Sequence, residues 1–230
     1  MLHPSSEYPP VYASLRARVR AVVEAADPVA LEAIAPTAPA WRVRDVLAHM
    51  VGVTSDVIAG RLDGVASDAW TAAQVDARRG ASVAEMLDEW DANGVPLSEL
   101  MPHAPDAAIG QMVFDAVTHE HDIRNALGAS GAHDSDAVLM SADWVCAMAP
   151  LRTAARGNAI VVEWPGGKLQ LGTGEVVNSV RLDSAFELVR SVSGRRSAKQ
   201  LGAADWSATP EPEAFLLADF FTFPNVDIIE

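Results

Sequence analysis

Apolar residues recur at every third or fourth position through most of the first two-thirds of the chain. This spacing is typical of amphipathic helices, because residues three and four positions apart lie on one face of an α-helix. Local signals mark some of the ends: Ser82 and Glu85 have the spacing of a capping box, and Gly128 is suited to a C-terminal cap. The helices expected on this basis cover residues 9–26, 42–62, 68–78, 82–93, 107–127 and 137–156.

After residue 156 the period of the pattern changes. Residues 159–164 and 168–171 are rich in apolar and β-branched residues and flank a Pro-Gly-Gly turn, which predicts a β-hairpin. Residues 176–182 could supply a third strand, and Asp183 is expected to cap a helix that follows it. This stretch therefore predicts a mixed α and β structure.

Together the two patterns predict a mainly α protein, with a helical bundle over residues 1–156 and a small α+β domain over residues 157–230. Half of the 230 residues are hydrophobic, which is enough for a substantial core. No stretch approaches the roughly 20 apolar residues that a membrane-spanning helix needs. The first residues also lack the basic and apolar regions of a secretory signal. We expect a soluble, cytoplasmic protein.

Charge narrows the choice of partners. The chain has 17 Lys and Arg against 31 Asp and Glu, a formal net charge of −14. Nucleic acids and anionic membranes bind clustered positive charge, so neither is an expected partner. Cys146 is the single cysteine, which excludes an intrachain disulfide and a Cys-rich metal site. Its apolar surroundings predict a small core residue rather than a nucleophile.

Histidines are the candidate metal ligands. Those in loop-like contexts, which we expect to be solvated, are His3, His103 and His133. On the helix 107–127, Asp115 and His119 are four residues apart and therefore stack on one face, whereas His121 points elsewhere. His49 lies at the flank of the apolar stripe of an earlier helix.

Two imidazoles and one carboxylate from His49, Asp115 and His119 would form an open zinc site. Three protein ligands hold the ion in such sites, and a fourth position takes water or substrate. Asp122 could orient a ligand imidazole from behind or anchor Arg124. The alternative is that this acidic helix face is merely solvated and that His49 is a hydrogen-bonded core histidine. Spacing leaves both interpretations open.

Three segments, in order along the chain, resemble the mycothiol-dependent maleylpyruvate isomerase family of DinB-like metal-binding bundles. They are residues 41–52 (WRVRDVLAHMVG), 115–128 (DAVTHEHDIRNALG) and 187–197 (ELVRSVSGRRS), the last followed by Asp205-Trp206. The resemblance implies a DinB-like up-and-down bundle and a small C-terminal domain.

The same resemblance implies that a divalent metal, in our expectation zinc, is held by His49, Asp115 and His119. The isomerase proper has glutamate where this chain has Asp115, so the reach is one methylene shorter. An arginine in the C-terminal Gly-Arg turn should close over the site. Arg195 fits best, as its guanidinium suits a substrate carboxylate, while for Arg196 we expect a surface salt bridge.

The implied chemistry uses mycothiol, whose sulfur would occupy the open metal position as a thiolate. An isomerase would add the thiolate to a cis double bond, allow rotation and release it, whereas an S-transferase would leave it on the electrophile. A metal-dependent hydrolase or lyase that uses water, or a non-catalytic metal-binding module, remains as an alternative. The partners expected are a small electrophilic substrate and a low-molecular-weight thiol; neither the substrate nor the choice of monomer or dimer follows from the sequence.

Overall fold

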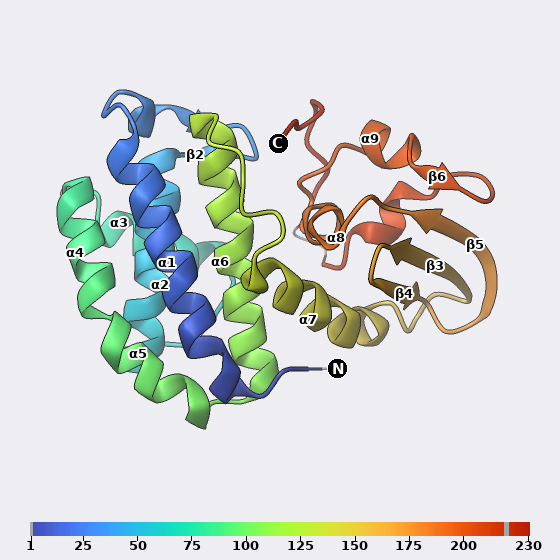
Figure 1. Cartoon of the computed structure of the whole chain (residues 1–230), viewed down its shortest axis with the longest axis horizontal. Helices are drawn as coiled ribbons and strands as arrows, with labels where there is room; N and C mark the ends of the chain where they lie inside the picture. The colour runs from blue at the N-terminus through green and yellow to red at the C-terminus, as the bar shows by residue number, and fades with distance from the viewer. Residues whose placement is uncertain (1, 219–220) are drawn as a thin grey trace. The chain divides into compact units, whose positions relative to one another are not determined.

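The computed structural model describes residues 2–218 and 221–230, which are mainly helical with a small region of sheet (Figure 1). They fold into two compact units. The helical unit holds residues 4–131, and the C-terminal unit holds the described residues between 132 and 229 together with residues 2 and 3. No helix in the described part of the chain is long and apolar enough to cross a membrane.

In the helical unit, α2 is the central element, because it contacts α3, α4, α5 and α6, while α1 packs against α5 and α6. The buried apolar side chains of α2 include Val46, Leu47 and Met50, and Trp90 of α4 is 1% exposed. Burial of such side chains provides the main stabilisation of the unit. The helices are α1 (Tyr8–Ala25), α2 (Val43–Ala59), α3 (Asp68–Ala77), α4 (Val83–Ala92), α5 (Gly94–Leu100) and α6 (Asp106–Leu127).

The ends of these helices follow from local chemistry. The capping box at Ser82 is present, with Ser82 Oγ accepting from Glu85 N, and Gly128 ends α6 in the left-handed conformation with φ 63°. Both features were predicted from the sequence. Two others were not: the chain continues as α5 directly after Asn93, and the connector before α2 forms a short antiparallel pair, β1 (Ile34–Ala35) and β2 (Ala38–Arg42).

The C-terminal unit contains a four-stranded sheet in the order β4-β3-β5-β6. The expected hairpin is present, with Trp164 opposite Gly167 at its turn, and the third strand pairs parallel to β3. The strands are β3 (Asn158–Trp164), β4 (Gly167–Leu171), β5 (Glu175–Arg181) and β6 (Asp205–Trp206). The helices are α7 (Asp136–Arg152), α8 (Ala185–Val192) and α9 (Ala198–Gly202).

Helix α7 differs from its expected place. We expected it to complete a first domain ending at residue 156, but it packs against α8 and β4 and groups with the C-terminal unit, which begins at residue 132. The cap of α8 also differs, because Ser184 Oγ rather than Asp183 accepts from Glu187 N, at 3.2 Å.

Candidate metal centre

The helical unit brings together the three residues predicted as metal ligands. His49 comes from α2, and Asp115 and His119 come from α6. One ligand atom from each lies within 4.8 Å of the other two. His49 Nε2 is 3.5 Å from Asp115 Oδ2, and His119 Nε2 is 3.6 Å from Asp115 Oδ1. The group could therefore hold a metal ion.

These separations fit metal ligands better than direct hydrogen bonds. A hydrogen bond from an imidazole to a carboxylate has a length of about 2.7–3.2 Å. Donor atoms at two corners of a tetrahedron around zinc, each about 2.1 Å from the ion, lie about 3.4 Å apart. The distances of 3.5 and 3.6 Å from the imidazoles, each to a different oxygen of Asp115, are closer to the second value.

The other nitrogen of each imidazole faces a fixed acceptor. His49 Nδ1 is 2.7 Å from Oε1 of Gln74, and His119 Nδ1 is 3.0 Å from Oδ2 of Asp122. A hydrogen bond to an acceptor assigns the proton to Nδ1, which leaves the lone pair on Nε2. Both Nε2 atoms lie near Asp115, so their lone pairs are available to a cation there. Zinc-binding histidines usually have such an acceptor behind them.

Burial distinguishes the two sides of the group. His49 and His119 are 2% and 7% exposed, whereas the Asp115 side chain is 38% exposed. The Trp41 ring centroid lies 5.1 Å from that of His49 and 5.9 Å from that of His119. Trp70 meets His49 edge-on at 6.5 Å. The site is enclosed by aromatic rings around the imidazoles and is accessible at the carboxylate.

The interpretation of this helix face as merely solvated is wrong. Glu120, His121 and Asp122 are all 1% exposed or less. Groups of this polarity are seldom buried without polar partners, and Glu120 has two. Arg18 donates to both of its carboxylate oxygens, at 2.9 and 2.8 Å, and Arg124 Nε donates to Oε1 at 3.0 Å.

Arg124 therefore plays a different part from the one expected. Its guanidinium binds Glu120 and the carbonyl of Ala129, and not Asp122. The spacing of four residues between Glu120 and Arg124 on a helix favours that pair. Arg124 supports the buried acid next to His119 rather than the carboxylate that orients His119.

Gln74 was not identified from the sequence. It is 3% exposed and reaches His49 because α3 approaches α2 closely at Gly52. A Cβ atom at Gly52 would lie 2.4 Å from Gln74 Cβ, well inside van der Waals contact. A glycine one turn after His49 was the available signal, but its partner is 25 residues away in sequence from the histidine.

The two arginines of the Gly-Arg turn belong to the C-terminal unit. Arg195 follows Gly194, which has φ 72°, and its Nη1 donates to the Ser193 carbonyl at 2.6 Å. Its role as a substrate-binding residue stays a prediction. Arg196 forms the expected salt bridge, with Glu187 at 2.7 Å, but it is 5% exposed and thus buried rather than at the surface.

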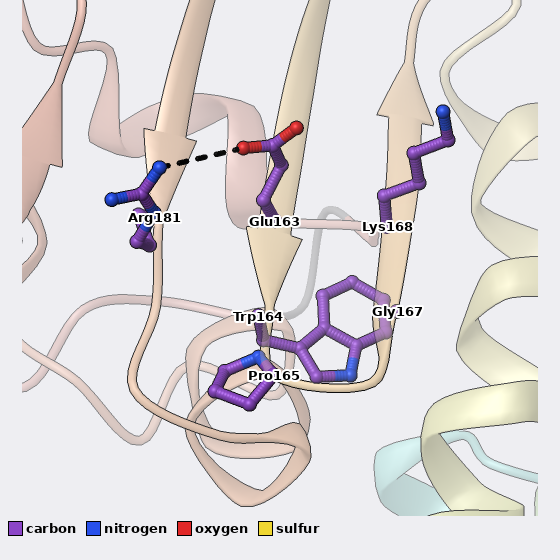
Figure 2. Close-up of a pocket in the computed structure, with 6 residues that line it drawn as sticks. All are labelled: Glu163, Trp164, Pro165, Gly167, Lys168 and Arg181. Atoms are coloured by element: carbon purple, nitrogen blue, oxygen red, sulfur yellow. Dashed lines mark ion pairs between the residues drawn. The ribbon is translucent and has the colours of Figure 1, made fainter.

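Two further features of the C-terminal unit lie outside the predicted site. An open pocket of about 550 Å³ lies beside the turn of the β3–β4 hairpin, lined by Trp164, Lys168 and Arg181 among others (Figure 2). Arg181 is 68% exposed and 4.0 Å from Glu163, so its charge is largely solvated. Cys146 is half-buried, and burial, followed by the charge of Asp143, raises the pKa of its thiol. It is therefore poorly suited to be a nucleophile.

Comparisons of the chain with protein-family models, with curated proteins and with solved structures gave no match. The structural evidence for a function is therefore the geometry of the three ligand residues and their supporting acceptors.

Proposed function

We propose that the protein is a divalent-metal-dependent enzyme in which His49, Asp115 and His119 hold the ion and leave one position open to a ligand. The observation that carries this proposal is the pairing of each Nδ1 with an acceptor, Gln74 or Asp122, while both Nε2 atoms lie near one carboxylate. Two histidines and one carboxylate form a common catalytic zinc set.

The remaining residues would prepare this site for a ligand. Asp115 is the most exposed of the three, so access would be from its side. Trp41 and Trp70 would exclude water from the imidazoles and offer apolar surface to a substrate. When bound, the metal would lower the pKa of a coordinated thiol enough to keep it deprotonated at neutral pH.

We further propose that the ligand is a thiol, and that the protein belongs among the DinB-like relatives of mycothiol-dependent maleylpyruvate isomerase. The support is the resemblance of three sequence segments, two of which contain the three ligand residues. A half-buried cysteine with a raised pKa fits a reaction whose sulfur comes from a cofactor. Isomerisation and thiol transfer are both compatible with this site. The resemblance implies that Arg195 binds an anionic substrate group in either reaction, and this stays a prediction.

A water-dependent hydrolase or lyase is the second candidate. The same open position favours it, because zinc lowers the pKa of bound water to about 7. A site that keeps an accessible carboxylate is less expected of a non-catalytic module, whose structural zinc usually has four protein ligands.

Elemental analysis of the purified protein, followed by calorimetric titration of the zinc-loaded form with mycothiol, tests the proposal. We expect one zinc per chain and saturable thiol binding. His49→Ala should lose the metal, whereas His103→Ala, at an exposed histidine, should keep it. Zinc without thiol binding would favour the hydrolase or lyase.

Asp115 needs a separate test because its side chain is short. Asp115→Glu should retain the metal, since it keeps the carboxylate, while Asp115→Ala should lose most of it. Equal retention by the two variants would remove Asp115 from the ligand set.

A further inference from the structure

We infer that Asp56 and Gln74 form a hydrogen-bonded relay that sets the tautomer of His49, so that its Nε2 lone pair is presented to the metal. The inference rests on the proposed metal site and adds two positioning residues to it. Neither residue lies in the sequence segments that suggested the site.

The first step is the orientation of the Gln74 amide. Its Nε2 lies 2.7 Å from Oδ2 of Asp56, and its Oε1 lies 2.7 Å from Nδ1 of His49. A carboxylate accepts hydrogen bonds and cannot donate them, so only the NH₂ end of the amide can face Asp56. The oxygen must then face His49, where it accepts a hydrogen bond from Nδ1–H.

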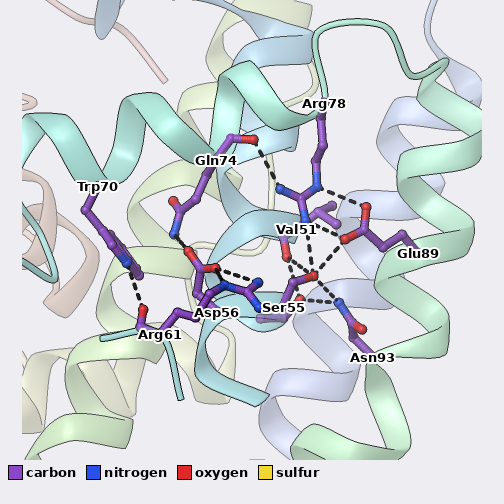
Figure 3. Close-up of polar contacts among 10 residues, drawn as sticks. Val51, Ser55, Asp56, Arg61, Trp70, Gln74, Arg78, Glu89 and Asn93 are labelled. Carbon is purple, nitrogen blue, oxygen red and sulfur yellow. Dashed lines mark hydrogen bonds and ion pairs between the residues drawn. The ribbon is translucent and has the colours of Figure 1, made fainter. Parts of the chain in front are cut away.

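The second step is the orientation of Asp56. Arg61 Nε donates to Oδ1 of Asp56 at 2.8 Å, and Gln74 takes the other oxygen, Oδ2 (Figure 3). The two carboxylate oxygens therefore have different donors. The donor and acceptor groups therefore have a fixed order along the chain of contacts from Arg61 through Asp56 and Gln74 to His49.

The third step is the position of α3, the helix that carries Gln74. Arg78, directly after this helix, donates to the carbonyl of Gln74 at 3.1 Å, to Ser55 of α2 at 3.1 Å and to Glu89 of α4 (Figure 3). Asn93 donates to the same Ser55 hydroxyl at 2.8 Å. These contacts hold the backbone of Gln74 in place, so its side chain has little freedom to turn away.

This arrangement predicts an effect from an isosteric change that does not touch His49. In Asp56→Asn, Arg61 requires the remaining oxygen, so the new NH₂ group faces Gln74. The Gln74 amide then turns over and presents its own NH₂ to Nδ1 of His49. His49 is driven to the Nε2–H tautomer, which has no lone pair for the metal.

Long-range ¹H–¹⁵N correlation spectra of the metal-free protein at about pH 8 report the tautomer directly. We expect Nδ1–H for His49 in wild type and Nε2–H in Asp56→Asn, with zinc affinity about ten-fold lower in the variant. Asp56→Asn/Gln74→Glu should restore both, because the introduced carboxylate accepts from His49 and from the new amide. Gln74→Leu should also lose the Nδ1–H preference, because it removes the oxygen that accepts from Nδ1.

Asp76→Asn is the matched control, since it removes one negative charge from the exposed side of α3 and should change neither readout. An unchanged tautomer in both Asp56→Asn and Gln74→Leu would overturn the relay. The spectra are recorded without metal, so they decide the relay even if wild type binds no zinc, which would contradict the proposed function instead.

Discussion

The two histidines of the site are supported in different ways. On α6, one helix supplies two ligands and a support, because Asp115, His119 and Asp122 lie within a span of eight residues. His49 depends on a different helix, since Gln74 of α3 lies behind it. The acceptor behind His119 is a charged carboxylate, whereas the acceptor behind His49 is a neutral amide.

The difference shows what each half of the site depends on. The α6 half of the site, Asp115, His119 and Asp122, is built by helix geometry, which places residues three and four apart side by side. The α2 half, His49 with Gln74 behind it, exists only when α2 and α3 are packed, so it depends on the tertiary fold. A charged acceptor raises the basicity of a ligand imidazole more than a neutral one does, so the His119 half should contribute more to metal affinity.

Removing the carboxylate behind His119 should have the largest effect. We expect Asp122→Ala to lower zinc affinity about 100-fold and Asp122→Asn about ten-fold, because a neutral amide supports the imidazole less well. Competition with a chromophoric chelator measures both. Asp63→Ala, at an exposed aspartate, is the control. Zinc affinity equal to wild type in Asp122→Ala would show that the two halves do not differ as described.

Separating α2 from α3 should weaken the His49 half. In Gly52→Ala, the new methyl group would meet Gln74 Cβ at 2.4 Å. We expect zinc affinity to fall about ten-fold and unfolding free energy to fall by about 1–2 kcal/mol, overpacking outweighing the gain in helix propensity. Chelator competition and urea unfolding measure these. Gly80→Ala, where nothing lies within 4 Å, should be silent, and an equally silent Gly52→Ala would contradict the close approach.

Removing the Arg78 guanidinium, while Gln74 stays against Gly52, should have a smaller effect. Arg78→Met removes the guanidinium that joins Gln74, Ser55 and Glu89. We expect a loss of about 1 kcal/mol in unfolding free energy, since Glu89 can turn to solvent, and a zinc affinity lowered about three-fold. Wild-type stability together with a large loss of zinc affinity in Arg78→Met would contradict this expectation.

Acid should slightly weaken the contact between Arg78 and Glu89 that attaches α3 to α4. Burial acts to raise the pKa of Glu89, but hydrogen bonds from Arg78 and Ser55 outweigh it and hold the pKa below its usual value. The ionised form is thus favoured in the folded protein, so its contribution is present above the unfolded pKa of about 4.3 and is lost as pH falls through the folded value.

Urea unfolding of the metal-free protein between about pH 3 and pH 6 tests this, with Glu89→Gln for comparison. The difference in unfolding free energy between the two proteins should be below about 1 kcal/mol near pH 6 and should shrink towards pH 3. A difference that grows on acidification would mean that the pKa of Glu89 is raised by folding.

The same contrast explains which parts of the molecule the sequence could predict. The longer helices α1, α2, α6 and α7, the capping box at Ser82 and the cap at Gly128 follow from local patterns and were predicted. Asp115 and His119 share a helix face, so their proximity was also predictable. The acceptor role of Gln74 was not, because no local pattern links it to His49 across 25 residues.

Two other differences arise from packing preferences that a single chain does not reveal. Helix α7 continues the run of helices before it, yet it groups with α8 and β4. Arg196 lies in a polar turn and nevertheless becomes buried, because Glu187 pairs with it and the Phe186 ring lies 5.7 Å below its guanidinium. Tertiary contacts outside the helical repeat decided the outcome in both places.

One side of the site should be held more firmly than the other. Glu120, which directly follows His119, belongs to the firmly held α6 side. Arg18 of α1 and Arg124 of α6 both donate hydrogen bonds to its buried carboxylate. Sliding α6 along α1 by one helical turn, about 5.4 Å, would break both hydrogen bonds from Arg18 to Glu120 at once. Ions of larger radius than zinc should therefore be accommodated by movement of α2 and α3, and the tolerance of the site for ionic size should depend on the neutral hydrogen bond between Gln74 and His49.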